Sequence, residues 1–211
     1  MPRTRGERAG LTLPAVVAAA RELLDERGIA GLAMRSVAER LGVAPNSLYT
    51  YVADKGALLD AVLDDLISGI GVPAASTAPR ASIETIMVDS FDALVRHPDL
   101  AGISLARQGS GSPNAWRLGH AILRSLAELG VPEPAARDGL RILLSHMMGT
   151  AAFATQYDTQ LGGRPHRAVE AHRADYVVAL GWLLDGILAQ GSTGSIGTAS
   201  RAMGETVRPV A

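Results

Sequence analysis

The sequence predicts an all-α protein made of two helical units. Apolar residues recur at spacings of three and four along most of the chain, which is the period of one helix face. No segment shows the strict alternation of a half-buried strand. The stretch 71–79 contains two prolines and several small residues, and it is the clear internal break. We therefore expect a smaller N-terminal helical unit and a larger C-terminal one.

Capping residues and helix-stopping glycines delimit four helices in the first unit. The expected helices cover residues 13–27, 35–41, 45–51 and 55–70. Thr12 and Asp54 are N-cap residues for the first and the fourth. Gly28 is expected to end the first helix in a left-handed conformation.

The second unit contains four longer helical patterns. They cover residues 82–96, 113–129, 133–155 and 165–190. His97-Pro98 ends the first, because a residue before proline is pushed out of the α region. The predicted organisation is then a flexible basic arm (1–10), a helical unit with a linker helix (11–70), a larger helical unit (80–190) and a disordered Gly-, Ser- and Thr-rich tail (191–211).

Composition excludes several classes of protein. The chain has no cysteine, which removes disulfides, thiolate catalysis and cysteine-bound zinc. It shows neither an apolar stretch long enough to span a bilayer nor a signal peptide, so a cytoplasmic location is expected. Aromatic residues make up 4% of the chain, which gives no reason to expect a stacked flavin or haem, and no cofactor is expected. The net charge is −1, yet residues 1–56 carry eight Arg and Lys against six Asp and Glu, so the N-terminal end is the one suited to approach phosphate.

Residues 31–55 carry the functional pattern: two short helices joined by a tight turn. Ala38 is small where the two helices would cross, and Gly42 supplies the positive φ of the turn. Five apolar residues are expected to face inward: Val37, Leu41, Val43, Leu48 and Val52. Six residues of the second short helix are then left on its outer and rim faces: Pro45, Asn46, Ser47, Tyr49, Thr50 and Tyr51.

Such a helix can lie in the major groove of DNA with its N-terminal end toward the base edges. Asn46 and Ser47 can donate and accept hydrogen bonds there, and Thr50 offers a methyl and a hydroxyl. Tyr49 and Tyr51 suit phosphate oxygens, and Arg35 and Lys55 suit phosphate charge. A flexible arm of three arginines could follow the DNA backbone: Arg3, Arg5 and Arg8. Taken singly, each residue has a plainer interpretation, as part of an ordinary helical hairpin, a partly buried tyrosine or a solvated charge.

The segments 34–43 and 48–52, followed by Lys55-Gly56-Ala57-Leu58-Leu59, resemble the tetracycline-repressor (TetR) family of transcriptional regulators. The resemblance implies that Arg35, Lys55 and the outward residues of the second short helix face DNA. One position departs from the pattern: many members have a threonine before the second helix, where this chain has Ala33-Met34. The usual phosphate contact from that threonine is therefore not carried over.

A weaker resemblance, at residues 96–100, 111–114 and 143–149, is to the C-terminal domain of the tetracycline-repressor-like subgroup. It implies that residues 80–190 bind a small-molecule effector and form a homodimer on a palindromic double-stranded DNA operator. The effector would favour a second state in which the fourth helix moves and the protein leaves DNA.

Polar and aromatic residues on the apolar helices are the candidate effector ligands. They are His97, Gln108, Asn114, Trp116, His146, Thr150, Phe153 and Gln156. Three methionines are equally suited to a core or to an apolar pocket: Met87, Met147 and Met148. The helices at 139–155 and 176–188 are the candidates for pairing across a two-fold axis, with apolar residues such as Met147, Ala151, Leu180 and Leu184, although the same pattern suits the core of a monomer.

The main alternative is a helical enzyme, or a ligand-binding protein without DNA binding, that uses His97, His120 or His146. None of the five histidines belongs to a nucleophile elbow, a phosphate-binding loop or an HExxH motif. A metal site assembled from distant segments stays open at this point, as does an adaptor that binds only protein. The sequence favours a regulator, with no catalytic residues and no metal.

Overall fold

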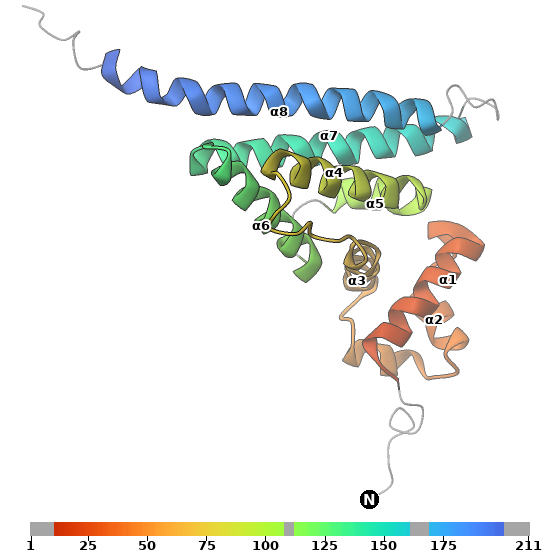
Figure 1. The fold of residues 1–211 in the computed structure, drawn as a ribbon. Coiled ribbons are helices and arrows are strands. Elements are labelled where there is room, and N and C mark those ends of the chain that lie inside the picture. Colours follow the sequence, from red (N-terminus) through yellow and green to blue (C-terminus); the bar gives the residue numbers. More distant parts are fainter. Residues whose placement is uncertain (1–10, 108–111, 161–168, 201–211) are drawn as a thin grey trace, which may run out of the picture.

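The computed structural model describes residues 11–107, 112–160 and 169–200, and every regular element in these ranges is helical (Figure 1). The N-terminal elements are α1 (Leu13–Gly31), α2 (Met34–Arg40), the 3-10 helix η1 (Pro45–Thr50) and α3 (Lys55–Ser68). The C-terminal elements are α4 (Pro79–Val95), α5 (Pro98–Ala106), α6 (Pro113–Glu128), α7 (Glu133–Gln160) and α8 (Val169–Ser200). The all-α prediction is confirmed. None of the described helices is both long and apolar enough to cross a bilayer.

The N-terminal elements pack around their own core, which is separate from the core of the longer helices. Val16, Val37, Leu48 and Leu58 are completely buried in this core and come from four different elements. Thr12 caps α1 by accepting a hydrogen bond from the Ala15 amide at 3.3 Å. As predicted, each short helix thus turns an apolar face inward and leaves its polar face to solvent.

Two turns in this unit depend on glycine. Gly28 has φ +64° and kinks α1, after which one more helical turn runs to Gly31. Gly42 has φ +65° in the turn after α2. Both lie in the left-handed region, which a side chain with a Cβ adopts only at a cost.

Gly42→Ala should therefore lower the free energy of unfolding by about 1 kcal/mol, because alanine is strained at positive φ. No atom of the described residues lies within 4 Å of the added Cβ, so the effect reports backbone strain. Gly69→Ala is the matched control, since Gly69 also has open space around it but has φ −74°. Urea denaturation should show Gly69→Ala as stable as the parent protein or more so. Equal destabilisation of the two variants would contradict this account of the turn.

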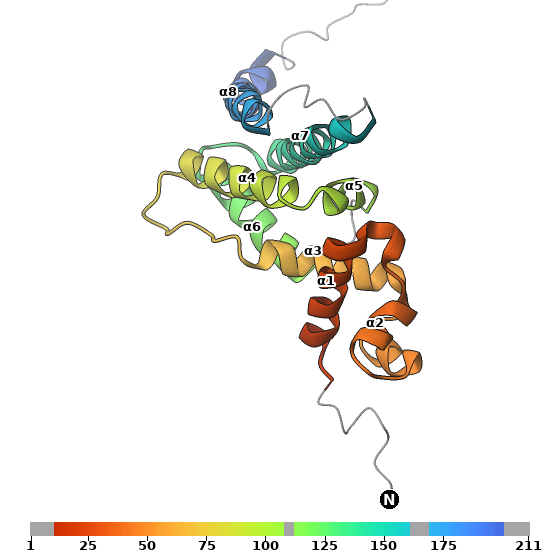
Figure 2. The same cartoon turned by 90° about the vertical axis from the view of Figure 1, so that its right-hand side faces the viewer.

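Figures 1 and 2 show the long helices α7 and α8 side by side at one end of the molecule and α1, α2 and η1 at the other. Between these two ends lie α3, α4, α5 and α6. The loop 69–78 joins α3 to α4, as the break in the sequence predicted. The helix α3 thus connects the N-terminal elements to the larger unit and contacts α1, α4, α5 and α6.

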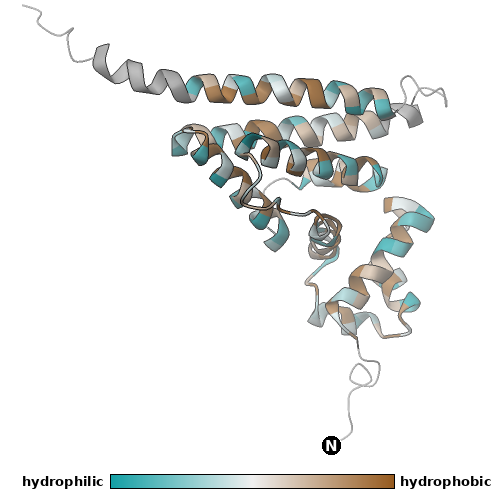
Figure 3. Ribbon diagram, viewed as in Figure 1, coloured by the Kyte–Doolittle hydropathy of each residue, from teal (hydrophilic) through white to brown (hydrophobic). Residues whose placement is uncertain are grey.

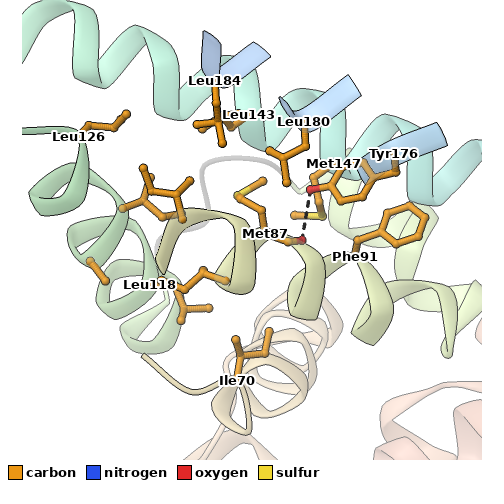
Figure 4. Close-up of a cluster of buried hydrophobic side chains, with 14 of the residues drawn as sticks. Ile70, Met87, Phe91, Leu118, Leu126, Leu143, Met147, Tyr176, Leu180 and Leu184 are labelled. Atoms are coloured by element: carbon orange, nitrogen blue, oxygen red, sulfur yellow. Dashed lines mark hydrogen bonds between the residues drawn. The ribbon is translucent and has the colours of Figure 1, made fainter. Parts of the chain in front are cut away.

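The larger unit has a continuous apolar core between α4, α6, α7 and α8 (Figure 4). Phe91 and Tyr176 stack with ring centroids 4.4 Å apart. The buried Tyr176 hydroxyl donates to the Met87 carbonyl oxygen at 3.2 Å. Burial raises the pKa of Tyr176 well above its usual value, because the phenolate would lose its hydration there.

Two predictions about this unit were wrong. The helix α5 was missed, although Pro98 in its first turn and Asp99 near its N-terminus are ordinary helix-start signals. Residues 191–200, expected to be disordered, continue α8. Extending an existing helix adds one hydrogen bond for each residue fixed, so a poor helix-forming sequence can follow a well-packed one. Residues 201–211 and the expected arm at 1–10 lie outside the described residues.

Candidate DNA-binding surface and ligand cavity

The outer surface of η1 is polar and exposed at the end of the molecule away from α7 and α8. Pro45, Asn46, Tyr49 and Thr50 are exposed, and Ser47 is half-buried. Leu48, in the middle of the same element, is completely buried in the N-terminal core, and η1 contacts α2. The expected helix at this position is a 3-10 helix: the Ser47 amide donates to the Ala44 carbonyl oxygen and the Tyr51 amide to that of Leu48, both at 2.9 Å.

Two residues predicted to contact phosphate also make contacts within the chain. The Tyr51 hydroxyl donates to the Leu11 carbonyl oxygen at 2.7 Å, which ties η1 to the start of α1. The Lys55 ammonium donates to the Ile29 carbonyl oxygen at 3.4 Å, near the end of α1. Tyr49 is 52% exposed, and Arg35 is also exposed. Tyr49 is therefore better placed than Tyr51 to reach another molecule.

The helix α2 has no side-chain cap at its N-terminus, because Ala33 occupies the N-cap position. This agrees with the departure noted in the sequence. The helix is held instead by Arg40 near its other end, which pairs with Glu26 and with Glu22, the latter at 3.0 Å. These contacts to α1 lower the pKa of Glu26, chiefly through the Arg40 hydrogen bond.

A cavity of about 480 Å³ lies between α3, α4, α5, α6 and α7. Its wall is mainly aliphatic and includes the three methionines singled out in the sequence, Met87, Met147 and Met148. Its volume is in the usual range for small-molecule sites. The helix α3 contributes Asp60, Leu63 and Ile67, so the cavity directly contacts the helix that follows η1.

One ion pair on the cavity wall joins α3 to the end of α5. The Arg107 guanidinium donates to both carboxylate oxygens of Asp60, with Nη2 and Oδ2 2.5 Å apart. The two side chains are 31% and 27% exposed, so the pair is mostly shielded from water. Asp60, by its hydrogen bond, raises the pKa of Arg107 further above its usual value. A Cβ on Gly56 would lie 3.2 Å from Arg107 Nη1, so the guanidinium sits directly against the first turn of α3.

Asp60→Asn should lower the free energy of unfolding by about 1 kcal/mol, because it removes the charge from a carboxylate that accepts two hydrogen bonds from the Arg107 guanidinium. Asp65→Asn is the matched control on the same helix. It removes the Arg21–Asp65 pair, whose side chains are 36% and 44% exposed, and it should cost less than about 0.5 kcal/mol. Chemical denaturation measures both changes. A cost for Asp60→Asn no larger than that for Asp65→Asn would contradict a coupling role for the pair.

Of the residues predicted to bind an effector, Trp116 lies on the cavity wall. His97 lies at a second, smaller and more charged pocket with Arg21 and Asp25, and its Nδ1 is 3.9 Å from Asp25 Oδ1. Asn114 instead joins α6 to α3, since its amide groups donate to Asp64.

The remaining candidates do not gather at the cavity. His146 stacks on Tyr176 with ring centroids 5.5 Å apart, and burial lowers its pKa. Its buried Nε2 has no hydrogen-bond partner among the described residues. Phe153 is 54% exposed and makes an edge contact with His172, and Thr150 is half-buried on α7. Gln108 and the side chain of Gln156 lie outside the described residues.

The outer faces of α7 and α8 carry exposed apolar side chains. Five of the ten exposed large hydrophobic residues in the described part of the chain lie there: Ile142, Phe153, Val177, Val178 and Trp182. Trp182 is the most exposed of them, at 72%. Figure 3 shows hydrophobic residues recurring along α8. The residues predicted to pair across the two-fold axis are instead buried in the core of the chain itself: Met147, Ala151, Leu180 and Leu184. A subunit contact through α7 and α8 would have to use their outer faces.

The three histidines of the enzyme alternative contact different parts of the molecule. His97 faces α1, His120 lies beside Trp116 on α6, and His146 stacks on α8. In the described ranges, no three His, Asp or Glu side chains are grouped so as to hold a metal ion.

Sequence reasoning missed Asp60 and Arg107, the two charged residues of the cavity wall. Asp60 carried a usable signal, because it interrupts the apolar residues of a helix at Leu59 and Ala61. Arg107 carried no such signal, because it is a single arginine at the end of α5, a helix that the sequence did not reveal.

Comparison with known proteins gives a consistent result. Residues 16–62, which include α2, η1 and most of α3, match the model for bacterial regulatory proteins of the tetR family. The HTH-type transcriptional repressor DrrR1 of Streptomyces coeruleorubidus is 33% identical over 150 residues, which cover 70% of this chain and 55% of that repressor. The class D tetracycline repressor protein of Escherichia coli is 30% identical over 163 residues, covering 74% of this chain and 72% of its own.

Solved structures show the same fold along most of the chain. Mycobacterium smegmatis BioQ superimposes with a TM-score of 0.74 at 30% identity, covering 85% of this chain and 99% of BioQ. BioQ with its natural double-stranded DNA operator gives a TM-score of 0.69 at 29% identity, with the same coverage. The chain belongs to the tetR family of bacterial regulatory proteins and is a DNA-binding transcriptional regulator rather than an enzyme.

Proposed function

We propose that the protein is a cytoplasmic, homodimeric repressor that binds a palindromic operator through η1 and leaves it when a small molecule enters the cavity. The observation that carries this proposal is the exposed polar surface of η1 held on a buried Leu48. A rigid scaffold with exposed polar side chains on a short helix suits the major groove. The BioQ–operator complex supports the same use of this fold.

Within this proposal Asn46, Ser47, Thr50 and Pro45 approach base edges. Their hydroxyl, amide and methyl groups match the groups that bases present in the major groove. Tyr49, Tyr51, Lys55 and Arg35 approach the phosphates on either side. The Lys55 ammonium keeps two donors beyond its bond to the Ile29 carbonyl oxygen, which supports its role. The Tyr51 hydroxyl would exchange its bond to the Leu11 carbonyl oxygen for one to a phosphate.

The proposed dimer forms through the outer faces of α7 and α8. These helices lie opposite η1 in the molecule, which leaves both recognition elements free to face DNA (Figure 2). Exposed apolar side chains such as Trp182 and Ile142 would be buried against their copies. Two copies of η1 could then occupy half-sites about one DNA turn, roughly 34–36 Å, apart.

Release by a ligand is proposed to act through α3. This helix carries Leu63 and Ile67 on the cavity wall, and its N-cap Asp54 is four residues beyond the end of η1. A ligand that binds better to a second arrangement of α3 would shift the population toward that arrangement. The Asp60–Arg107 ion pair joins α3 to the end of α5. A movement of α3 would therefore change the geometry of this pair.

The test is binding to the DNA upstream of the protein's own gene, titrated with salt. We expect a specific shift whose affinity falls steeply with salt, because phosphate contacts release counterions. A transcription reporter under the same promoter should rise when the gene is deleted. Absent or sequence-independent binding would contradict operator recognition, and a reporter that falls on deletion would contradict repression.

A further inference from the structure

The first turn of α6 is bonded to a carboxylate in the C-terminal half of α3. The Asn114 backbone amide donates to Asp64 Oδ1 at 2.8 Å, and the Asn114 side-chain Nδ2 donates to Asp64 Oδ2 at 2.9 Å. Asp64 thereby satisfies one of the amides that a helix N-terminus leaves without an intrahelical partner, and its negative charge suits the positive end of the helix dipole. Both residues are half-buried, so water competes little for these bonds.

Arg117, one turn further along α6, binds the end of α3. Its Nη2 donates to the Ile70 carbonyl oxygen at 2.9 Å and lies 3.4 Å from those of Ile67 and Ser68. The last carbonyl groups of a helix have no intrahelical partner and carry the negative end of the dipole, so a guanidinium is favourable there. The Arg117 Nε also donates to Asn114 Oδ1 at 3.3 Å, which links the two residues of α6.

We call Asp64, Asn114 and Arg117 the α6 latch. It holds one end of a helix whose other half belongs to the N-terminal unit, since Leu58 and Val62 of α3 are completely buried in the N-terminal core. The helix α3 has 14 residues, which is about 21 Å at 1.5 Å per residue. A tilt of about 10° at the latched end would move the end beside η1 by roughly 3.6 Å, which is about one base-pair step of DNA.

We propose that the α6 latch fixes the tilt of α3 and thereby sets the spacing between the two recognition elements of the dimer. Asn114 and Arg117 are then positioning residues for operator binding, although both lie outside the η1 surface. The inference rests on the proposed function, because a defined spacing matters to a dimer that reads two half-sites. Without the α6 latch, α3 samples more tilts, so fewer molecules hold the operator spacing and more accept an altered one.

Arg117→Met and Arg173→Met are a matched pair of variants. Each removes one positive charge and one link between helices while keeping an apolar side chain. Arg117→Met removes the bonds to the end of α3. Arg173→Met removes a pair of bonds from α8 to Asp92 of α4, at 2.8 Å from Nε and 3.0 Å from Nη2. Asn114→Ala is the second α6 latch variant, and it takes the place of Arg117→Met if that protein unfolds below the assay temperature.

Hydrogen exchange followed by mass spectrometry tests whether the α6 latch holds α3. In the DNA-free protein, the α6 latch variants should exchange the amides of residues 65–70 about fivefold faster or more, because the end of α3 opens more often. Exchange at residues 16–24 of α1 should stay as in the parent, and Arg173→Met should leave residues 65–70 unchanged. Unchanged exchange at residues 65–70 in the folded α6 latch variants would overturn the inference.

DNA binding tests whether the α6 latch sets the spacing. The probes are the DNA upstream of the protein's own gene and the same DNA with one base pair inserted between the half-sites. The parent and Arg173→Met should bind the lengthened DNA about 100-fold more weakly, because one half-site is then poorly contacted. In the α6 latch variants this penalty should fall about fivefold or more. An unchanged penalty together with faster exchange at residues 65–70 would show that the α6 latch only stabilises the helix, and would overturn the positioning role.

Failure of the proposed function gives a different result in the same experiment. A parent protein that binds both DNAs equally, or neither, would contradict the reading of two half-sites and, with it, the consequence of the α6 latch for spacing. A parent that shows the full penalty, with α6 latch variants that keep it, would contradict the positioning role alone.

Discussion

Replacing Tyr49 and Lys55 together with alanine should reduce operator affinity by about 100-fold or more, because removing each DNA-contacting side chain costs about 1–3 kcal/mol in a complex of this kind. Both residues are exposed, Tyr49 on η1 and Lys55 at the start of α3. The loss of Lys55 should also reduce the slope of log affinity against log salt by about one. Fluorescence anisotropy with a labelled operator at several salt concentrations measures both effects.

The fold should survive this double substitution. Tyr49 is 52% exposed, and the single bond of Lys55 to the Ile29 carbonyl oxygen is long, at 3.4 Å. Arg137→Ala is the matched control, because it removes one positive charge from a 71% exposed side chain on α7. It should change operator affinity less than twofold. A double variant that binds as tightly as the parent, or one whose thermal unfolding temperature falls steeply, would contradict the assignment of this surface.

Trp182→Asp should convert the dimer into a monomer and lower operator affinity by about 1000-fold, since a monomer contacts only one half-site. The new carboxylate would have to be buried without a partner in an apolar interface, which is strongly unfavourable. In the monomer it is solvated, because Trp182 is 72% exposed. Sedimentation equilibrium gives the oligomeric state, and anisotropy gives the affinity.

Leu105→Asp is the control for an exposed apolar residue elsewhere, since Leu105 on α5 is 42% exposed. This variant should stay dimeric and bind DNA like the parent. A Trp182→Asp protein that remains a dimer with full operator affinity would place the subunit contact outside the α7 and α8 faces.

The N-terminal unit was predictable from sequence because its signals are local. Thr12 and Asp54 cap the helices where their side chains indicated, accepting from the amides of Ala15 and Ala57. Gly42 adopts the positive φ that the turn required. Each of these features depends on residues within three or four positions of one another, so the local sequence is enough to predict it.

The cavity was much less predictable because it is assembled from five helices. Trp116 was identified, but Asp60 and Arg107 meet across 47 positions of sequence. His146 and Asn114 look like ligands in a sequence, yet they contact Tyr176 and Asp64. Which side of α7 faces inward depends on how α4 and α8 pack on it, and hydrophobic periodicity alone does not distinguish an inner face from an outer face that is also apolar.

Two predictions failed for opposite reasons. Apolar residues are spread so evenly along α5 that its sequence shows no helical period. In the structure, however, Leu100 and Ala101 are buried and Asp99 is exposed. Residues 191–200 have a composition typical of disorder, but they extend a helix already held by Leu184 and Ile187. In both cases the packing of neighbouring elements, rather than the local composition, determines that the segment is helical.

The most direct test of the account is the distance between the two recognition elements in the operator-bound protein. The chain has no cysteine, so Ala53→Cys, in the exposed turn after η1, provides one spin-label site in each copy. Pulsed electron paramagnetic resonance on the DNA complex should give a single distance near one DNA turn, about 35 Å before the length of the labels is added. Absence of dipolar coupling, or a distance that does not fit two successive major grooves, would contradict a dimer that reads two half-sites through η1.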